Sequence, residues 1–177
     1  MGTTPPPGTP AMHSEAMAWV AMYRTDDPLT VLDIGGRNVN GTPRDLFPNA
    51  TYTALDIEPG PGVDIVADAG TWTPTDQWDL VVSTECFEHT ENWRDIIHTA
   101  YKALRPGGMF IATMAGPGRP LHSGITGEVG RQLDGEYYGN VDPKDLHGAL
   151  VANGFESVTV DQRFEPCDVR CAALRPL

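Results

Sequence analysis

One short segment limits the possible folds of this chain more than any other. An apolar run at residues 31–34 ends in a glycine-rich turn, and a second apolar run at residues 51–56 ends in Asp56. Gly35 and Gly36 can adopt a positive φ, which lets a ligand approach the backbone closely. A carboxylate after the second strand can accept hydrogen bonds from a ribose diol. This order predicts a parallel α/β sheet with a nucleoside pocket.

Length and charge narrow the class of protein. The chain has 177 residues, of which 40% are hydrophobic, enough for one domain with a full central sheet. Its 24 acidic residues face 12 Lys and Arg, so the formal net charge is -12. Nucleic-acid binding depends on clustered cations that release counterions, so DNA or RNA is not expected as a partner. Arg105, Arg119 and Arg131 are the candidates for a local basic patch near a site.

Cysteine spacing and hydropathy bear on the compartment. Cys86, Cys167 and Cys171 fit neither a disulfide framework nor a four-ligand zinc site, and no metal is expected. No apolar run reaches membrane-spanning length, and the proline-rich residues 1–10 lack the charge and apolar core of a signal peptide. We therefore expect a cytoplasmic protein with a disordered or extended tail at residues 1–10 and a single domain over residues 11–177.

Periodicity predicts alternating strands and helices. Short apolar runs suited to buried parallel strands lie at residues 30–34, 51–56, 63–66, 78–83 and 109–114. Helical spacing predicts a leading helix over residues 14–24, whose apolar stripe either packs against the sheet edge or forms a lid over the cofactor. A second helix is predicted over residues 91–104, ending at the turn 105–108.

The last part of the chain predicts one helix and two strands. Asp142 is expected as the N-cap of a helix, with Pro143 at its first position and its end near Asn153. Strands are predicted at residues 155–160 and 168–174 with no helix between them. Two consecutive strands indicate a terminal antiparallel hairpin.

Several segments, taken in order, carry a resemblance to a known family. They are the turn at residues 31–41, Asp56, Asp68-Ala69 after the third predicted strand, the motif IV-like segment 78–85 and the turn 104–110. Together they resemble the class I S-adenosylmethionine-dependent methyltransferases of the small, single-domain, type 11-like kind. The resemblance implies a Rossmann-like fold with a seven-stranded, mostly parallel sheet, helices on both faces and a C-terminal antiparallel hairpin.

The same resemblance implies the cofactor and its contacts. S-adenosylmethionine is the expected cofactor and S-adenosylhomocysteine its product. Asp56 is expected at the ribose diol and Asp68 at the adenine amino group. The residues implied to bind the cofactor are Asp33, Gly35, Gly36, Asn38, Asp56, Ile57, Asp68, Ala69, Thr84 and Glu85.

A dinucleotide site is the main alternative for the glycine turn. A nicotinamide-binding dehydrogenase also uses a glycine turn and an acidic residue after the second strand, but residues 35–41 do not match the G-x-G-x-x-G spacing. The Asp33 carboxylate disfavours an anion and suits a sulfonium or ammonium group. A second hypothesis for Asp33 is a buried carboxylate that accepts hydrogen bonds from the turn amides.

Candidate catalytic residues follow the fourth predicted strand. His89 is the leading candidate base, with Glu85 and Glu88 as neighbours that orient it or contact the acceptor. The alternative is that Glu88 and His89 cap the following helix. His122 is the second candidate base and His13 the third. Cys86 lacks the Pro-Cys context of cytosine-C5 methyltransferases, and flanking carboxylates raise a thiol pKa, so a nucleophilic role is not expected.

A long connection at residues 115–140 is the predicted acceptor-binding cap loop. Its arginine, histidine and paired tyrosines suit an aromatic or anionic small molecule, while the alternative is a packed surface cap with the tyrosines in the core. The predicted activity is methyl transfer to a small-molecule acceptor. The alternatives are a catalytically inactive S-adenosylmethionine-binding regulatory or scaffold protein and, behind it, a protein or nucleic-acid methyltransferase. The acceptor atom and the oligomeric state stay open.

Overall fold

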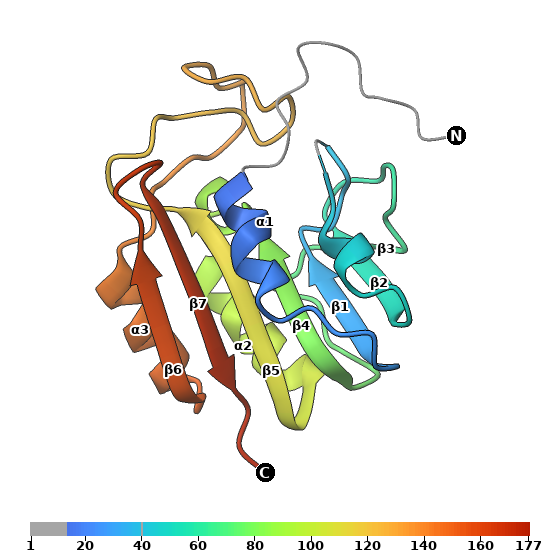
Figure 1. Ribbon diagram of the computed structural model, residues 1–177. Coiled ribbons are helices and arrows are strands. Elements are labelled where there is room, and N and C mark those ends of the chain that lie inside the picture. The colour runs from blue at the N-terminus through green and yellow to red at the C-terminus, as the bar shows by residue number, and fades with distance from the viewer. Residues whose placement is uncertain (1–13, 40) are drawn as a thin grey trace.

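A computed structural model describes residues 14–39 and 41–177. The predicted tail at residues 1–10 and the third candidate base, His13, lie outside the described residues. The strands are β1 (Thr30–Ile34), β2 (Thr51–Asp56), β3 (Ile65–Val66), β4 (Trp78–Thr84), β5 (Leu104–Ala115), β6 (Glu156–Gln162) and β7 (Asp168–Leu174). They form one seven-stranded sheet in the order β3-β2-β1-β4-β5-β7-β6 (Figure 1).

The sheet is parallel except at its C-terminal hairpin. Strands β3, β2, β1, β4 and β5 pair in parallel with their neighbours. Strand β7 is antiparallel to both β5 and β6. The predicted Rossmann-like class and terminal hairpin are therefore confirmed, because two consecutive strands without a helical crossover can pair only in opposite directions.

Helices cover both faces of the sheet. The α-helices are α1 (Ser14–Ala21), α2 (Trp93–Ala103) and α3 (Pro143–Ala152), and two short 3-10 helices are η1 (Pro43–Leu46) and η2 (Phe87–His89). Figure 1 shows α1 in front of the sheet and α2 and α3 behind it. None of the helices in the described part of the chain is both long and apolar enough to span a bilayer.

The position of α1 corrects one prediction. Trp19 and Val20 are buried with Val82 and Ile111 in a cluster on the front face, and Trp19 Nε1 donates a 3.1 Å hydrogen bond to the carbonyl oxygen of Cys171. The helix thus lies across β5 and β7, neither at the sheet edge nor over the pocket described below. Its apolar stripe covers central strands that would otherwise expose this face to water.

The local signals for the other helices are confirmed. The Asp142 side chain accepts hydrogen bonds from the backbone amides of Lys144 and Asp145, and α3 begins at Pro143. Helix α2 begins two residues later than predicted, at Trp93, and runs directly into β5.

The topology brings one set of strand ends to a common edge. The carboxyl ends of β1, β4 and β5 point upward in Figure 1, and the long connection from β5 to α3, coloured yellow to orange, crosses above the sheet. Ligands of open α/β sheets bind at this edge. Residues 116–142 contain turns, irregular segments and one isolated bridge, His122 with Val129, but no helix or strand.

Candidate active site

A cavity of about 1190 Å³ lies at the carboxyl ends of the strands, and the connection after β5 forms one of its walls. The predicted site residues that line it are Asp33, Gly35, Gly36, Asp56, Ile57, Asp68, Ala69, Thr84, Glu85, His89 and His122. Asn38 is the exception, because it lines a smaller neighbouring cavity of about 370 Å³ instead. Its side-chain oxygen accepts a hydrogen bond from the Gly41 amide, which holds it within the turn.

The glycine turn packs tightly between two strand ends. The amides of Gly35 and Gly36 both donate to the carbonyl oxygen of Leu55, over 2.8 and 3.1 Å. Gly35 has a φ of 77°, and a Cβ atom there would lie 2.7 Å from the Cys86 sulfur. Only glycine suits this position, since an added side chain would be strained and would collide with the end of β4.

Asp33 is a buried carboxylate with one satisfied oxygen. Only 1% of the residue is exposed, and Oδ2 accepts a 2.7 Å hydrogen bond from the Tyr52 hydroxyl. Among the described residues Oδ1 has no hydrogen-bond partner. Burial raises the pKa of Asp33 to about 7. The turn amides donate to Leu55, so the hypothesis that Asp33 accepts their hydrogen bonds is wrong.

Backbone amides orient the two carboxylates expected at the nucleoside. Asp56 accepts hydrogen bonds from the amides of Arg37, over 3.1 Å, and Glu58, over 2.9 Å. Asp68 Oδ1 accepts a 2.8 Å hydrogen bond from the Gly70 amide. Each carboxylate oxygen can accept more than one hydrogen bond, so both groups keep acceptor capacity toward the cavity.

Glu85 directly follows β4 and lines the cavity. Its φ is 51°, and its Oε2 lies 3.5 Å from an Nη atom of Arg119 on the long connection. Arg119 also forms an ion pair with Asp168 at the start of β7. Burial, followed by the charge of Asp168, raises the pKa of Glu85 to about 7. This three-residue ionic cluster ties the cap loop to two strands.

Two histidines meet at the same side. The ring centroids of His89 and His122 lie 4.9 Å apart, and the Tyr138 ring packs against both. Burial and the nearby His122 lower the pKa of His89 to about 4, and burial also lowers the pKa of His122. Both imidazole rings are therefore uncharged at about pH 7. Helix α2 has Asn92 at its N-cap, so the alternative that Glu88 and His89 cap it is wrong.

Burial disfavours the thiolate form of Cys86 at this edge. Burial raises the pKa of Cys86 to about 12, and the charge of Glu88 adds to the shift. A thiol with such a pKa is almost entirely protonated at neutral pH, in agreement with the expectation that Cys86 is not a nucleophile.

Two contacts at the site were not predicted from the sequence, that of Tyr52 with Asp33 and that of Asp168 with Arg119. Tyr52 was not considered, although β1 and β2 pair in parallel with Asp33 opposite Ala54, which places Tyr52 two residues earlier on the same face. Asp168 was assigned only to a strand, because nothing local links it to Arg119. Arg105 and Arg131, by contrast, do not line the cavity and pair with Asp79 and Glu128.

The fold defines an α/β protein with one large cavity at the carboxyl ends of its parallel strands, the edge at which open α/β sheets bind ligands. The family described as "Methyltransferase domain" matches residues 11–160. The chain therefore belongs to that methyltransferase domain family, as the sequence resemblance predicted.

Individual relatives are more distant. Ubiquinone biosynthesis O-methyltransferase of Hydrogenovibrio crunogenus is 27% identical over 113 residues, which cover 54% of this chain and 47% of the relative. The chain thus spans about half the length of this curated relative.

Two solved structures share the fold at low identity. The Haemonchus contortus phosphoethanolamine N-methyltransferase 2 superposes with a TM-score of 0.70 at 16% identity, over 92% of this chain and 52% of that chain. It was solved with phosphomonomethylethanolamine and S-adenosylhomocysteine. The Burkholderia thailandensis 1,6-didemethyltoxoflavin-N1-methyltransferase gives 0.68 at 17% identity, over 96% and 80%.

Proposed function

We propose that this chain is an S-adenosylmethionine-dependent methyltransferase that acts on a small-molecule acceptor. The observation that carries the proposal is one continuous cavity with oriented carboxylates on one side and two neutral histidines on the other. The first side suits a nucleoside and the second an acceptor. Family membership and the S-adenosylhomocysteine bound to the structural neighbours support the same cofactor.

The cofactor is proposed to lie along the glycine turn. Asp56 would accept hydrogen bonds from the ribose hydroxyls and Asp68 from the adenine amino group. The open Oδ1 atom of Asp33 would face the cationic methionine portion. Thr84 and Glu85, at the carboxyl end of β4, would then flank the methionine portion, and the two histidines line the same cavity beyond them.

For methyl transfer, the protein mainly has to align the acceptor with the methyl group. A lone pair of the acceptor forms the new bond to the methyl carbon, the carbon–sulfur bond breaks, and its electron pair stays on sulfur. Walls that align the acceptor and exclude water supply most of the rate enhancement. His89 is the candidate to take up a proton from the acceptor, with His122 second and Glu85 beside them, because neutral imidazoles can accept one.

The shape and charge of the cavity favour a small acceptor. The connection after β5 closes one wall with apolar and aromatic side chains, including Ile125, Val129 and Tyr137. The net charge of -12 opposes a nucleic-acid substrate. The name of the curated relative, a ubiquinone biosynthesis O-methyltransferase, supports a small organic acceptor.

The experiment separates binding from turnover. Calorimetry with S-adenosylhomocysteine is expected to give equal affinity for the wild type and for Asp76→Ala, an exposed control outside the cavity, and an affinity weaker by about tenfold or more for Asp56→Ala. Labelled S-adenosylmethionine is then incubated with a metabolite extract, and a labelled small product is expected. Binding without any transfer would favour the inactive regulatory alternative, and no binding would reject both.

A further inference from the structure

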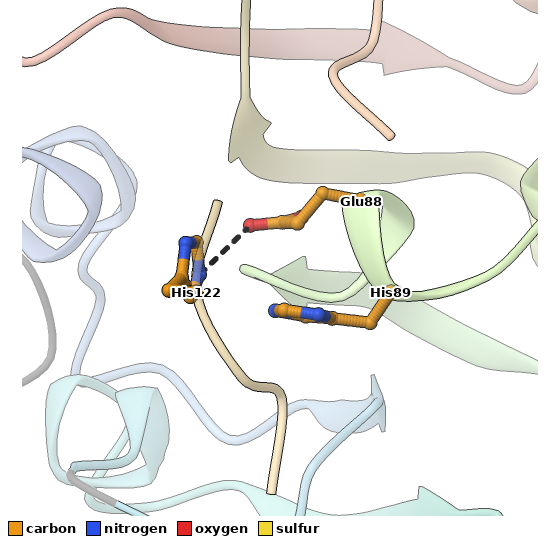
Figure 2. Close-up of side chains that lie close together, drawn as sticks. All are labelled: Glu88, His89 and His122. Atoms are coloured by element: carbon orange, nitrogen blue, oxygen red, sulfur yellow. Dashed lines mark ion pairs between the residues drawn. The ribbon is translucent and has the colours of Figure 1, made fainter. Parts of the chain in front are cut away.

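We propose that Glu88, His89 and His122 bind a divalent transition-metal ion on the acceptor side of the cavity. One ligand atom from each of the three residues lies within 4.8 Å of the other two. Figure 2 shows the Glu88 carboxylate directed at His122, with the His89 ring beside both. Two ligand atoms that each lie about 2.0–2.2 Å from a zinc ion lie roughly 3.3 Å from each other. Small rotations of these three side chains would therefore complete the site.

Glu88 supplies the independent sign of a missing cation. The residue is 0% exposed, and neither carboxylate oxygen makes a hydrogen bond among the described residues. Burial and the charge of Glu85 raise the pKa of Glu88 well above the ordinary value. A buried carboxylate without hydrogen bonds is costly, and a bound cation removes that cost.

The histidines are prepared as neutral ligands. His122 Nδ1 lies 3.3 Å from the carbonyl oxygen of Pro120, which can only accept, so Nδ1 carries the proton. The Nε2 lone pair is then free and lies 3.9 Å from Glu88 Oε1. Fixing one ring nitrogen with a backbone carbonyl is the arrangement that orients metal-binding histidines. His89 Nδ1 is buried and makes no hydrogen bond among the described residues.

The residues around Glu88, His89 and His122 close this group on one side and leave it open toward the cavity. The Tyr138 hydroxyl donates to the Pro120 carbonyl oxygen, so it closes the site from one side without serving as a ligand. A Cβ at Gly124 would lie 2.9 Å from His89, so glycine is needed for the loop to pass this ring. His89 and His122 line the cavity while Glu88 lies behind them, so an open coordination position would face the acceptor.

The donor set indicates the metal and the acceptor. Two imidazoles and one carboxylate suit Zn²⁺, Mn²⁺, Fe²⁺ or Co²⁺, whereas Mg²⁺ and Ca²⁺ prefer all-oxygen sites. This role rests on the proposed function: the ion would bind an acceptor hydroxyl and lower its pKa. The hydroxyl proton passes to water, the oxygen forms the bond to the methyl carbon, and the carbon–sulfur electron pair remains on sulfur. A hydroxyl-bearing acceptor is therefore inferred, and His89 acts as a ligand in place of a base.

The test measures metal binding without turnover. Tag-free, chelator-treated protein is titrated with Co²⁺, whose visible absorption reports nitrogen and oxygen ligation, and is then challenged with Zn²⁺. The wild type and His147→Ala, an exposed histidine on α3, are expected to bind one equivalent with equal affinity. Glu88→Gln and His122→Ala are expected to lose at least about tenfold in affinity.

Binding of S-adenosylhomocysteine to each variant serves as the folding control. Unchanged binding of that ligand together with weakened Co²⁺ binding supports the metal site. Equal Co²⁺ affinity in the wild type and both ligand variants, or no Co²⁺ binding by the wild type, overturns it. A specific Co²⁺ spectrum in protein that transfers no methyl group would support the site while rejecting the proposed function.

Discussion

The Tyr52 hydroxyl donates a 2.7 Å hydrogen bond to Asp33 Oδ2, which joins the neighbouring strands β1 and β2. Asp33 is almost fully buried, and burial raises its pKa from an ordinary value of 3.8 to about 7. The free energy of unfolding of the empty protein is therefore linked to this carboxyl group.

The sign of the linkage gives the first prediction. Between pH 3.8 and about 7, folded Asp33 holds a proton that the unfolded chain releases, so its stabilising contribution is complete below that window and declines as the pH rises through it. Asp33→Asn cannot titrate, so its melting temperature should fall less than that of the wild type across this window. Thermal melts of ligand-free protein test this, and parallel pH profiles would contradict it.

Gly35→Ala should destabilise the protein more than backbone strain alone explains. Gly35 and Gly130 both have a φ of 77°, but a Cβ at Gly130 meets nothing within 4 Å, whereas one at Gly35 meets Cys86. We expect Gly130→Ala to cost about 1–2 kcal/mol and Gly35→Ala to cost more, with weaker cofactor binding. Urea unfolding of both variants measures the difference. Equal losses of unfolding free energy in the two variants would show that the contact with Cys86 does not contribute.

Asp68→Ala should remove recognition of the adenine amino group. Wild-type protein is expected to bind S-adenosylhomocysteine more tightly than its deaminated inosine analogue, by about tenfold, and the variant should bind both alike. Asp56→Ala is the matched control, because loss of a ribose contact weakens both ligands equally and preserves their ratio. Calorimetry measures the ratio of the affinities for the two ligands in each variant. An unchanged ratio in Asp68→Ala would place the purine elsewhere.

Arg119→Gln should be strongly destabilising because it removes the cation between two buried carboxylates. The side chains of Arg119, Glu85 and Asp168 are 14%, 17% and 3% exposed. Loss of one partner from a buried ion pair costs about 3–5 kcal/mol, whereas Arg131→Gln, which breaks an exposed pair with Glu128, should cost under about 1 kcal/mol. Chemical unfolding checks both. A small loss for Arg119→Gln would mean that solvent screens the cluster.

His89→Ala should lower the turnover number at saturating cofactor by about 10²-fold or more, whether the ring acts as a base or as a metal ligand. The affinity for S-adenosylhomocysteine should stay unchanged, because the ring lies on the acceptor side. His98→Ala, an exposed residue on α2, is the control. Single-turnover methyl transfer and calorimetry separate the two quantities. Wild-type turnover in His89→Ala would dismiss both roles.

Local chemistry made much of the fold predictable. The positions of the strands, the Asp142 and Pro143 start of α3 and the glycine turn depend on neighbouring residues, so the sequence is enough to recognise them. Strand lengths were less predictable, since β3 is shorter than expected and β5 extends through the predicted turn at residues 105–108. The edge that carries the cavity could also be predicted, because the carboxyl ends of parallel strands meet there and bring Asp33, Asp56 and Glu85 to one cavity.

Distant pairings needed the tertiary structure. Neither α1 nor the connection at residues 116–142 carries a local signal for where it docks, so α1 was expected at the sheet edge or over the cofactor and lies on the face of β5 and β7. The same connection brings His122 to Glu88 and His89, whose nearness in space has no counterpart in their spacing along the chain. Residue types and local periodicity determined the sheet and the edge at which its parallel strands end. Packing of irregular segments, which depends on contacts between residues far apart in the chain, decided which side chains close the cavity at residues 116–142.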